Sequence, residues 1–382
     1  MNDNHAGGPS AVLAIRNPAD LLAAVPYLVG FHTDESIVVV GLARPRMNAV
    51  FTMRSDLPPS NDPAEIAGRA SYLAHVLALQ HPAYAMIAGF GPGARVTPIA
   101  EAVRTEIEAL DIPVRESLRA HDGRYWSYLC ASVACCPPEG TVYDPTASVF
   151  AAHATVAGCV ALPDRAALVA EVAPVGGAER AAMRAATERA ERRFAALVGR
   201  ALSGTPPEAG ERPPAEVGAA AVGAALDRHA AGAVLGDDEV AWLALLLTHL
   251  RVRDEAWVRI DERDDHAHRG AQRGLWTHVL RRVEPDYVPA PACLLAYTAW
   301  RDGDGGLANV ALDRARRADP GYTMACLIDQ LLSSGSPPGA WRPLNRGDLG
   351  LDDARAARHR ARHQRRRAAQ PPRLAAGGRP GR

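Results

Sequence analysis

The sequence predicts an α/β N-terminal domain with a mixed sheet, followed by an all-α C-terminal domain of repeat-like helical hairpins. Two observations carry this prediction. Apolar strand-like runs alternate with helical patterns up to residue 130, whereas only helical patterns follow residue 215. Between them, residues 203–214 are rich in proline and glycine, as linkers usually are. We therefore divide the chain into an α/β domain with trailing helices, a linker, a helical domain and an Arg-rich, disordered tail, at 11–202, 203–215, 216–340 and 341–382.

The first helix and the first two strands follow from local patterns. Asn17 and Pro18 are typical of an N-cap and a first helical residue, which predicts a helix over 17–28. The runs 36–42 (SIVVVGL) and 49–53 (AVFTM) are β-branched or apolar and lie close together in the sequence. They are expected to form an antiparallel pair that opens the sheet.

A helix, a strand and a glycine-rich turn come next. Residues 61–79 have a helical pattern, and the apolar run 83–90 ends in the turn 89–93 (GFGPG), ahead of a helix expected over 99–110. A strand, a glycine turn and a helix in this order suggest a nucleotide site, but the full Gly-x-Gly-x-x-Gly spacing is absent. The alternative is an ordinary turn whose glycines supply positive φ. No cofactor-binding residue is assigned here.

The remaining elements complete the sheet and build the helical region. Strands are expected over 112–118 and 125–130, around a turn at 121–123. A small alanine-rich helix and a helix introduced by Pro163 and Asp164 are expected between residues 149 and 172. Further helices are expected at 178–202, 240–251, 254–261, 269–283, 290–302, 306–318 and 322–332.

The helical region contains two similar sequence segments. Residues 281–287 (RRVEPDY) and 316–322 (RRADPGY) are related by an offset of 35 positions, a period typical of stacked helical pairs. The unit 292–320 resembles a tetratricopeptide repeat, although Ala292 and Ala299 replace its usual tryptophan and tyrosine. The resemblance rests on Ala296, Ala308, Leu312, Ala315 and Pro320. It implies a concave face that binds peptides or other proteins.

Composition excludes several function classes. The chain has 43 basic and 43 acidic residues, so its overall charge selects neither nucleic acid nor an anionic membrane. Every basic residue is arginine, which excludes a Schiff-base lysine and a P-loop lysine. The longest apolar run, 240–247, is shorter than the roughly 20 residues of a membrane span, so a cytoplasmic location without membrane contact is expected. There the six cysteines should be thiols or ligands.

The C-terminal end is strongly basic. Ten arginines and no acidic residue follow Asp353. Such a segment can be a basic arm that binds nucleic acid or another polyanion, or a solvated tail without a partner. We expect nucleic-acid binding, if any, through this tail alone.

Residues 115–141 (RESLRAHDGRYWSYLCASVACCPPEGT) form the most distinctive stretch of the chain. Its cysteines follow the spacing C-x4-C-C rather than the paired C-x2-C of common zinc sites. A metal site, with zinc as the possible ion, is one interpretation, and His32 or Cys159 could complete it if the fold brought them close. The metal-ligand candidates of this stretch are Cys130, Cys135, Cys136 and His121.

Two further interpretations remain open for the same stretch. Cys135 can be a nucleophile if His121, or arginines such as Arg119 and Arg124, favour its thiolate. The structural alternative is that the aromatic residues of 125–130 pack a strand and the cysteines fill tight space.

Elsewhere, a loop before the first strand groups side chains suited to acid and base catalysis. Its candidates are His32, Asp34 and Glu35.

At these motifs the chain resembles the actinobacterial family called domain of unknown function 4192. The resemblance spans about residues 10–335 and rests on four segments. They are 26–42 (PYLVGFHTDESIVVVGL), 123–130 (GRYWSYLC), 135–141 (CCPPEGT) and 240–257 (VAWLALLLTHLRVRDEAW). The resemblance implies a cytosolic bacterial protein whose two regions form one unit, but no activity or catalytic residues.

Two functions are therefore expected from the sequence. The first is a non-enzymatic binding or scaffold protein whose helical half contacts a protein partner. The second is an enzyme, or a metal- or ligand-binding protein, with its site at the Cys/His/Trp-rich segment of the α/β domain. The sequence leaves the choice between enzyme and non-enzyme open.

Overall fold

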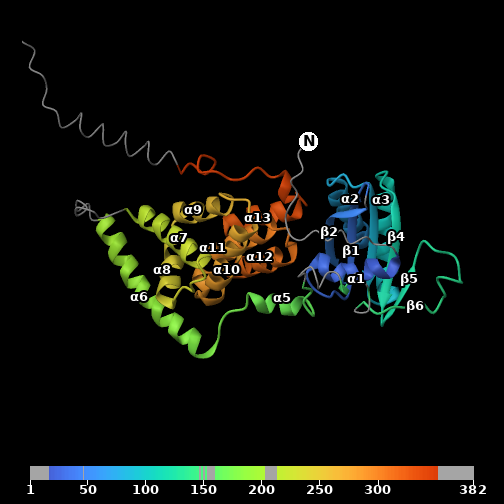
Figure 1. Ribbon diagram of the computed structural model, residues 1–382, viewed down its shortest axis with the longest axis horizontal. Coiled ribbons are helices and arrows are strands. Elements are labelled where there is room, and N and C mark those ends of the chain that lie inside the picture. The colour runs from blue at the N-terminus through green and yellow to red at the C-terminus, as the bar shows by residue number, and fades with distance from the viewer. Residues whose placement is uncertain are drawn as a thin grey trace, which may run out of the picture.

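The computed structural model describes residues 17–45, 47–145, 148, 151–152, 160–202 and 213–351. The described chain forms a sheet with three helices and, beside it, a larger group of helices (Figure 1). The predicted alanine-rich helix between residues 149 and 158 and the Pro/Gly linker lie largely outside the described residues.

A six-stranded mixed sheet forms the first half, in the order β2-β1-β3-β4-β5-β6. Only β3 and β4 pair in parallel, and the other neighbours are antiparallel. The strands are β1 (Ser36–Ala43), β2 (Asn48–Asp56), β3 (Tyr84–Phe90), β4 (Val114–His121), β5 (Arg124–Ser127) and β6 (Thr141–Val142). The predicted mixed sheet, with an antiparallel first pair, is thus confirmed.

The central strands are buried because helices cover both faces of the sheet. Ile37 and Val39 of β1 pack beneath α2 (Pro63–Ala78) and α3 (Gly93–Ala109). Val38 and Val40, which point to the other face, pack with α1 (Pro18–Val29). A strand buried on both faces reads as a continuous apolar run, which explains the pattern of 36–42.

Helix α3 begins at Gly93, six residues earlier than the sequence predicts. Pro98 therefore lies inside the helix, where it cannot donate a hydrogen bond to the carbonyl oxygen of Ala94. The side-chain amide of Asn61 donates to this oxygen instead, at 2.9 Å. A contact from outside the helix thus satisfies the group that the proline leaves open. Gly91 has φ +134°, as the ordinary-turn interpretation requires.

The second half is entirely helical in its described residues. Its helices are α5 (Arg165–Glu171), α6 (Gly177–Leu202), α7 (Pro214–Ala230), α8 (Asp237–Leu246), α9 (Leu250–Ile260), α10 (His266–Arg282), α11 (Pro289–Arg301), α12 (Gly305–Ala318) and α13 (Thr323–Ser333), with short 3-10 turns η1 (Pro285–Tyr287) and η2 (Pro338–Ala340). Helix α7 was not predicted from the sequence, and the helix predicted over 240–251 is divided between α8 and α9.

The predicted hairpin over 292–320 is present as α11 and α12, which pack on each other. Its small and large apolar residues are buried at the contact, since alanine allows two helices to approach closely. Helix α6 also contributes to this core through Met183 and Ala186, as α5 does through Leu168. The packing boundary therefore falls between the sheet and α5, whereas the sequence placed it after residue 202.

The two halves touch through α1, α2 and the segments around them. The hydroxyl of Tyr72 donates to the carbonyl oxygen of Ser333, and the amide of Gln80 donates to that of Gly335. Phe31 forms a bridge with Leu162 and packs into the helical core. These contacts join the sheet and the helices into one unit.

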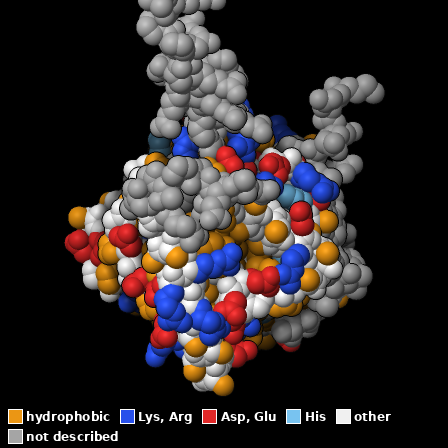
Figure 2. Space-filling view, turned by 90° about the vertical axis from the view of Figure 1, so that its left-hand side faces the viewer, with side chains coloured by type: hydrophobic (Ala, Val, Ile, Leu, Met, Phe, Trp, Pro, Cys, Tyr) orange, Lys and Arg blue, Asp and Glu red, His pale blue; other side chains and the backbone are white. Residues whose placement is uncertain are grey.

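The surface at the α6 end of the helical half carries both signs of charge. Figure 2 shows arginine and carboxylate side chains interleaved on this face. The ion pairs Arg189–Asp238 and Arg228–Glu239 join α6 and α7 to α8. In the described part of this face, basic and acidic side chains therefore alternate rather than forming one large basic patch. Within the described residues, no helix combines the length and the apolar character that crossing a membrane requires.

The chain after α13 does not leave the fold at residue 340. Residues 341–351 run along the helical half, with Leu351 buried. The predicted tail is thus ordered over its first eleven positions. All ten arginines of the basic arm lie beyond Asp353, outside the described residues.

Candidate functional site

Three cysteine thiols converge in the loop between β5 and β6. The Sγ atoms of Cys130, Cys135 and Cys136 all lie within 4.8 Å of one another. Those of Cys130 and Cys135 are 3.0 Å apart. Among the described residues this is the one group of three or more ligand-type side chains close enough to hold a metal ion together.

A serine at each turn of this loop brings the thiols together. The Ser127 hydroxyl accepts hydrogen bonds from the backbone N–H groups of Leu129 and Cys130, which ends β5 at Ser127 rather than at Cys130. The carbonyl oxygen of Ser132 accepts from the N–H groups of both Cys135 and Cys136. The second turn therefore directs two sequence-adjacent cysteines toward Cys130, an arrangement that the C-x4-C-C spacing does not suggest.

Trp126 holds the far end of the loop against the sheet. Its indole N–H donates to the carbonyl oxygen of Pro138 at 2.9 Å, and its ring packs on Gly140. The guanidinium of Arg119, on the neighbouring strand β4, lies 3.6 Å from the centre of the same indole. A cation stacked on an indole also helps to hold the ring in place. The loop is thus held at both ends, which limits how far the thiols can separate.

The three thiols do not ionise independently. The hydrogen bond from Cys135 is the main cause that lowers the pKa of Cys130, with further help from the Ser132 backbone and Cys136. Burial, together with the two neighbouring thiols, raises the pKa of Cys136 to about 12. One thiolate is therefore favoured at Cys130, while a second negative charge at Cys136 is opposed until a cation compensates it.

The other predicted metal ligands are not part of this cluster. His121 lies in the β4–β5 turn, where its Nε2 is 3.4 Å from the carboxylate of Asp122. His32 is exposed, and its backbone N–H donates to the carbonyl oxygen of Leu162. Neither histidine belongs to the three-cysteine cluster found among the described residues. Cys159 lies outside the described residues.

The loop 31–35, with its predicted acid and base residues, sits at a different place on the sheet. It precedes β1, which is three strand positions from β5, or about 14 Å at the usual strand spacing. Glu35 there faces Gly91 and lies 3.8 Å from Arg95, while Asp34 and His32 are exposed. The two groups of candidate residues therefore lie three strand positions apart on the sheet.

The turns and the loop closure that shape the thiol site were not predicted from the sequence, which indicated only strand packing for the aromatic residues of 125–130. Ser127 and Ser132 make the turns, and Trp126 and Gly140 close the loop. The available signals were the serine that precedes each cysteine group and the glycine that follows the Pro-Pro pair. Both are common in loops of any kind, so neither identifies the cluster alone.

Gly140 offers a direct test of this loop closure. An added Cβ would lie 2.5 Å from the Trp126 ring, and the residue has φ +81°. We expect Gly140→Ala to lower the free energy of unfolding by about 1–3 kcal/mol, through backbone strain and overpacking. Gly123→Ala is the matched control because Gly123 also has positive φ but no atom near its Cβ position. Equal losses in chemical denaturation of both variants would contradict the indole contact.

Comparison with known proteins yields one match. The family model described as Domain of unknown function (DUF4192) matches residues 18–339. No curated protein and no solved structure matches the chain. The match includes the sheet, the thiol loop and α5 to α13, and it ends just before residues 341–351.

Proposed function

The chain belongs to the DUF4192 family, whose description assigns no function, and we propose from its geometry that the protein binds a thiophilic metal ion, zinc above all. The ligands are Cys130, Cys135 and Cys136. The observation that carries the proposal is the convergence of their three Sγ atoms within 4.8 Å.

The spacing of these atoms suits a tetrahedral ion. Zinc–sulfur bonds of about 2.3 Å place two sulfurs of a tetrahedron about 3.8 Å apart. The Cys130–Cys135 pair, at 3.0 Å, needs to open slightly, which the repulsion of two thiolates favours. Thiolates select zinc and other soft ions over magnesium or calcium. Three protein ligands leave a fourth position for water or an external ligand, as in zinc sites that act on bound molecules.

The metal content of the full-length protein tests this function. Protein purified without chelators should contain about one zinc per chain, as structural or catalytic sites of this type do. Replacement by cobalt should add a sulfur-to-cobalt charge-transfer band, which requires thiolate ligation. Protein that carries no zinc, takes up no cobalt and exposes three freely reactive thiols in this loop would refute the proposal.

The affinity should depend on pH in a defined direction. Because the pKa of Cys136 is raised to about 12, its thiol is protonated near neutral pH and must release a proton to bind zinc. The logarithm of the zinc affinity should therefore rise by at least about one per pH unit between pH 6 and 8. Competition with a chromophoric chelator measures this slope. A flat profile would mean that Cys136 does not bind the ion.

A second function, non-enzymatic protein binding by the helical half, has its own support. Residues 341–351 already lie on α9 and α11, which the resemblance of α11 and α12 to a peptide-binding repeat would lead one to expect. Tagged full-length chain should retain a specific protein from cell extract. Recovery equal to that of the tag alone would count against this function. The five free cysteines of the described chain fit the cytoplasmic location that we propose for both.

A further inference from the structure

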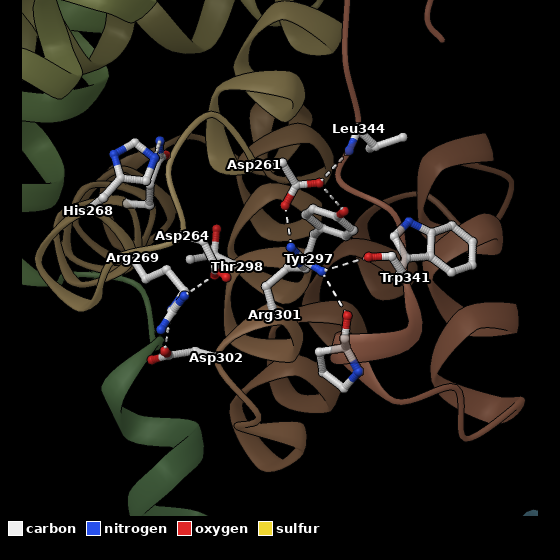
Figure 3. Close-up of polar contacts among 12 residues, drawn as sticks. Asp261, Asp264, His268, Arg269, Tyr297, Thr298, Arg301, Asp302, Trp341 and Leu344 are labelled. Atoms are coloured by element: carbon white, nitrogen blue, oxygen red, sulfur yellow. Dashed lines mark hydrogen bonds and ion pairs between the residues drawn. The ribbon is translucent and has the colours of Figure 1, made fainter. Parts of the chain in front are cut away.

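The segment Trp341–Leu351, which we call the strap, is held on the helical half in the way a bound peptide is held. Five residues of α9, its C-cap and α11 form the surface beneath it, which we call the strap seat. They are Glu255, Asp261, Tyr297, Trp300 and Arg301. Figure 3 shows the side chains of Asp261, Tyr297 and Arg301 turned toward Leu344 and Trp341.

Asp261 recognises the backbone of the strap. Its Oδ2 accepts a hydrogen bond of 2.8 Å from the N–H of Leu344 and one of 2.6 Å from the hydroxyl of Tyr297 (Figure 3). Arg301 donates to the carbonyl oxygen of Pro338, just before the strap, and to that of Trp341, the first strap residue. Contacts to backbone N–H and C=O groups bind a chain segment without demanding particular side chains.

Two side chains of the strap add specificity. Arg346 donates through one guanidinium nitrogen, Nη1, to both carboxylate oxygens of Glu255, a charge-assisted contact to a buried carboxylate. The indole of Trp341 meets that of Trp300 edge to face, with centroids 6.1 Å apart. The strap thus presents an aromatic residue, a backbone N–H that binds Asp261 three positions later and an arginine five positions later.

The carboxylates of the strap seat require such an occupant. The side chain of Glu255 is 6% exposed and that of Asp261 is 1% exposed. A buried carboxylate that loses a donor is costly, so the seat favours a segment that brings an arginine and an N–H. Arg259 reaches only one oxygen of Glu255, at 3.5 Å, and does not replace Arg346.

The family match separates the strap seat from the strap. Every seat residue lies within the matched range 18–339, and the strap lies wholly after it. The strap is also only lightly covered, with Trp341 41% exposed and the Arg346 side chain 46% exposed. The receiving surface thus belongs to the family domain, while this occupant is added to it.

We propose that the strap seat is a peptide-binding site and that the strap is its built-in, displaceable occupant. The partner is a short segment of another protein that carries an aromatic residue and, five positions later, an arginine. This inference rests on the second function proposed above, for which it names the ligand, and it is independent of the metal site. A partner must displace the strap, so the strap limits access to the site.

A peptide with the strap's own sequence, GAWRPLNRGDLGL (residues 339–351), is the probe. Full-length chain with Trp341→Ala and Arg346→Ala should bind the labelled peptide about tenfold more tightly than the unmodified chain, because the tethered strap no longer competes at its high effective concentration. Arg342→Ala is the matched control, since Arg342 pairs with Asp348 within the strap. Fluorescence anisotropy measures the binding, and circular dichroism checks the fold of each variant.

Peptide specificity and the unmodified chain complete the test. A peptide with alanine in place of Arg346 should bind the strap-weakened chain at least about tenfold more weakly. In the unmodified chain, excess peptide should speed hydrogen exchange at the Leu344 amide as the strap is displaced. Equal peptide binding by the strap-weakened and unmodified chains, or an unchanged exchange rate, overturns the inference. If the full-length chain still captures a protein from extract, the second function survives and only this ligand assignment fails.

Discussion

Cys135→Ser should lower the zinc affinity of the full-length chain at least about 100-fold, because outer-shell changes alone cost about 10–100-fold and this change removes a direct ligand. Cys135 touches both other members of the cluster. Its thiol hydrogen-bonds that of Cys130, and its neighbour Cys136 shares the Ser132 turn. Chelator competition at one fixed pH measures the affinity.

Cys326→Ser is the matched control for this substitution. Cys326 is also an exposed free thiol, but it lies on α13, outside the cluster. Its replacement should leave the zinc affinity and the cobalt spectrum unchanged. If both serine variants bind zinc as tightly as the unmodified chain, the ion does not sit at the thiol loop. A shared loss of affinity would instead point to a second zinc-binding position at α13.

Asp261→Ala should lower the free energy of unfolding by about 3–5 kcal/mol, the usual cost of removing one partner from a buried ion pair. Arg301 Nε lies 2.8 Å from Asp261 Oδ1, although its N–H does not point at that oxygen. The same carboxylate accepts from Tyr297 and from Leu344. Burial raises the pKa of Tyr297, so its hydroxyl remains a donor across the neutral range. The variant therefore strands an arginine, a phenol and a backbone N–H at once.

Asp261→Asn separates the charge from the shape. It keeps an acceptor for Tyr297 or Leu344 but removes the negative charge beside Arg301, so its loss should be clearly smaller than that of the alanine variant. Urea denaturation of the full-length variants measures both. A loss below about 1 kcal/mol for Asp261→Ala would place it among ordinary surface changes and remove the energetic reason for the strap contact.

The sheet was predictable because its signals are local. The run 36–42 is apolar at successive positions because Ile37 and Val38 face opposite, equally buried sides. Asn17 caps α1 through a 2.8 Å hydrogen bond to the N–H of Asp20, and Gly30 ends it with φ +92°, as their residue types suggest. Burial and capping determine the residue types over a few neighbouring positions, so they can be recognised from sequence patterns.

Other boundaries depend on neighbours that are distant in sequence. Pro98 argues against an early start for α3, yet Asn61 satisfies the carbonyl that the proline leaves without a donor. Helix α8 ends at Leu246 without a glycine or proline at the break, so that α9 can pack against α7 and α11. The local sequence carries no information about the Asn61 contact or about the packing of α9.

For the thiol site, too, the sequence predicted some features and not others. The sequence identified Cys130, Cys135 and Cys136 as possible ligands, and also His121, which the structure leaves in a separate turn. Neither the direction of two adjacent thiols nor the distance to a histidine is encoded in spacing. The Ser132 turn and the closure at Trp126 set both.

The residue pattern of this chain was sufficient to define a mixed sheet, a helical half and a cysteine-rich loop, because each reflects burial or turn chemistry over neighbouring positions. The meeting of three thiols and the seating of the strap were decided by the tertiary structure alone. Arg346 meets Glu255 across 91 positions of sequence. Such pairs form because folded helices and strands bring their side chains together. The local sequence around either residue does not predict the contact.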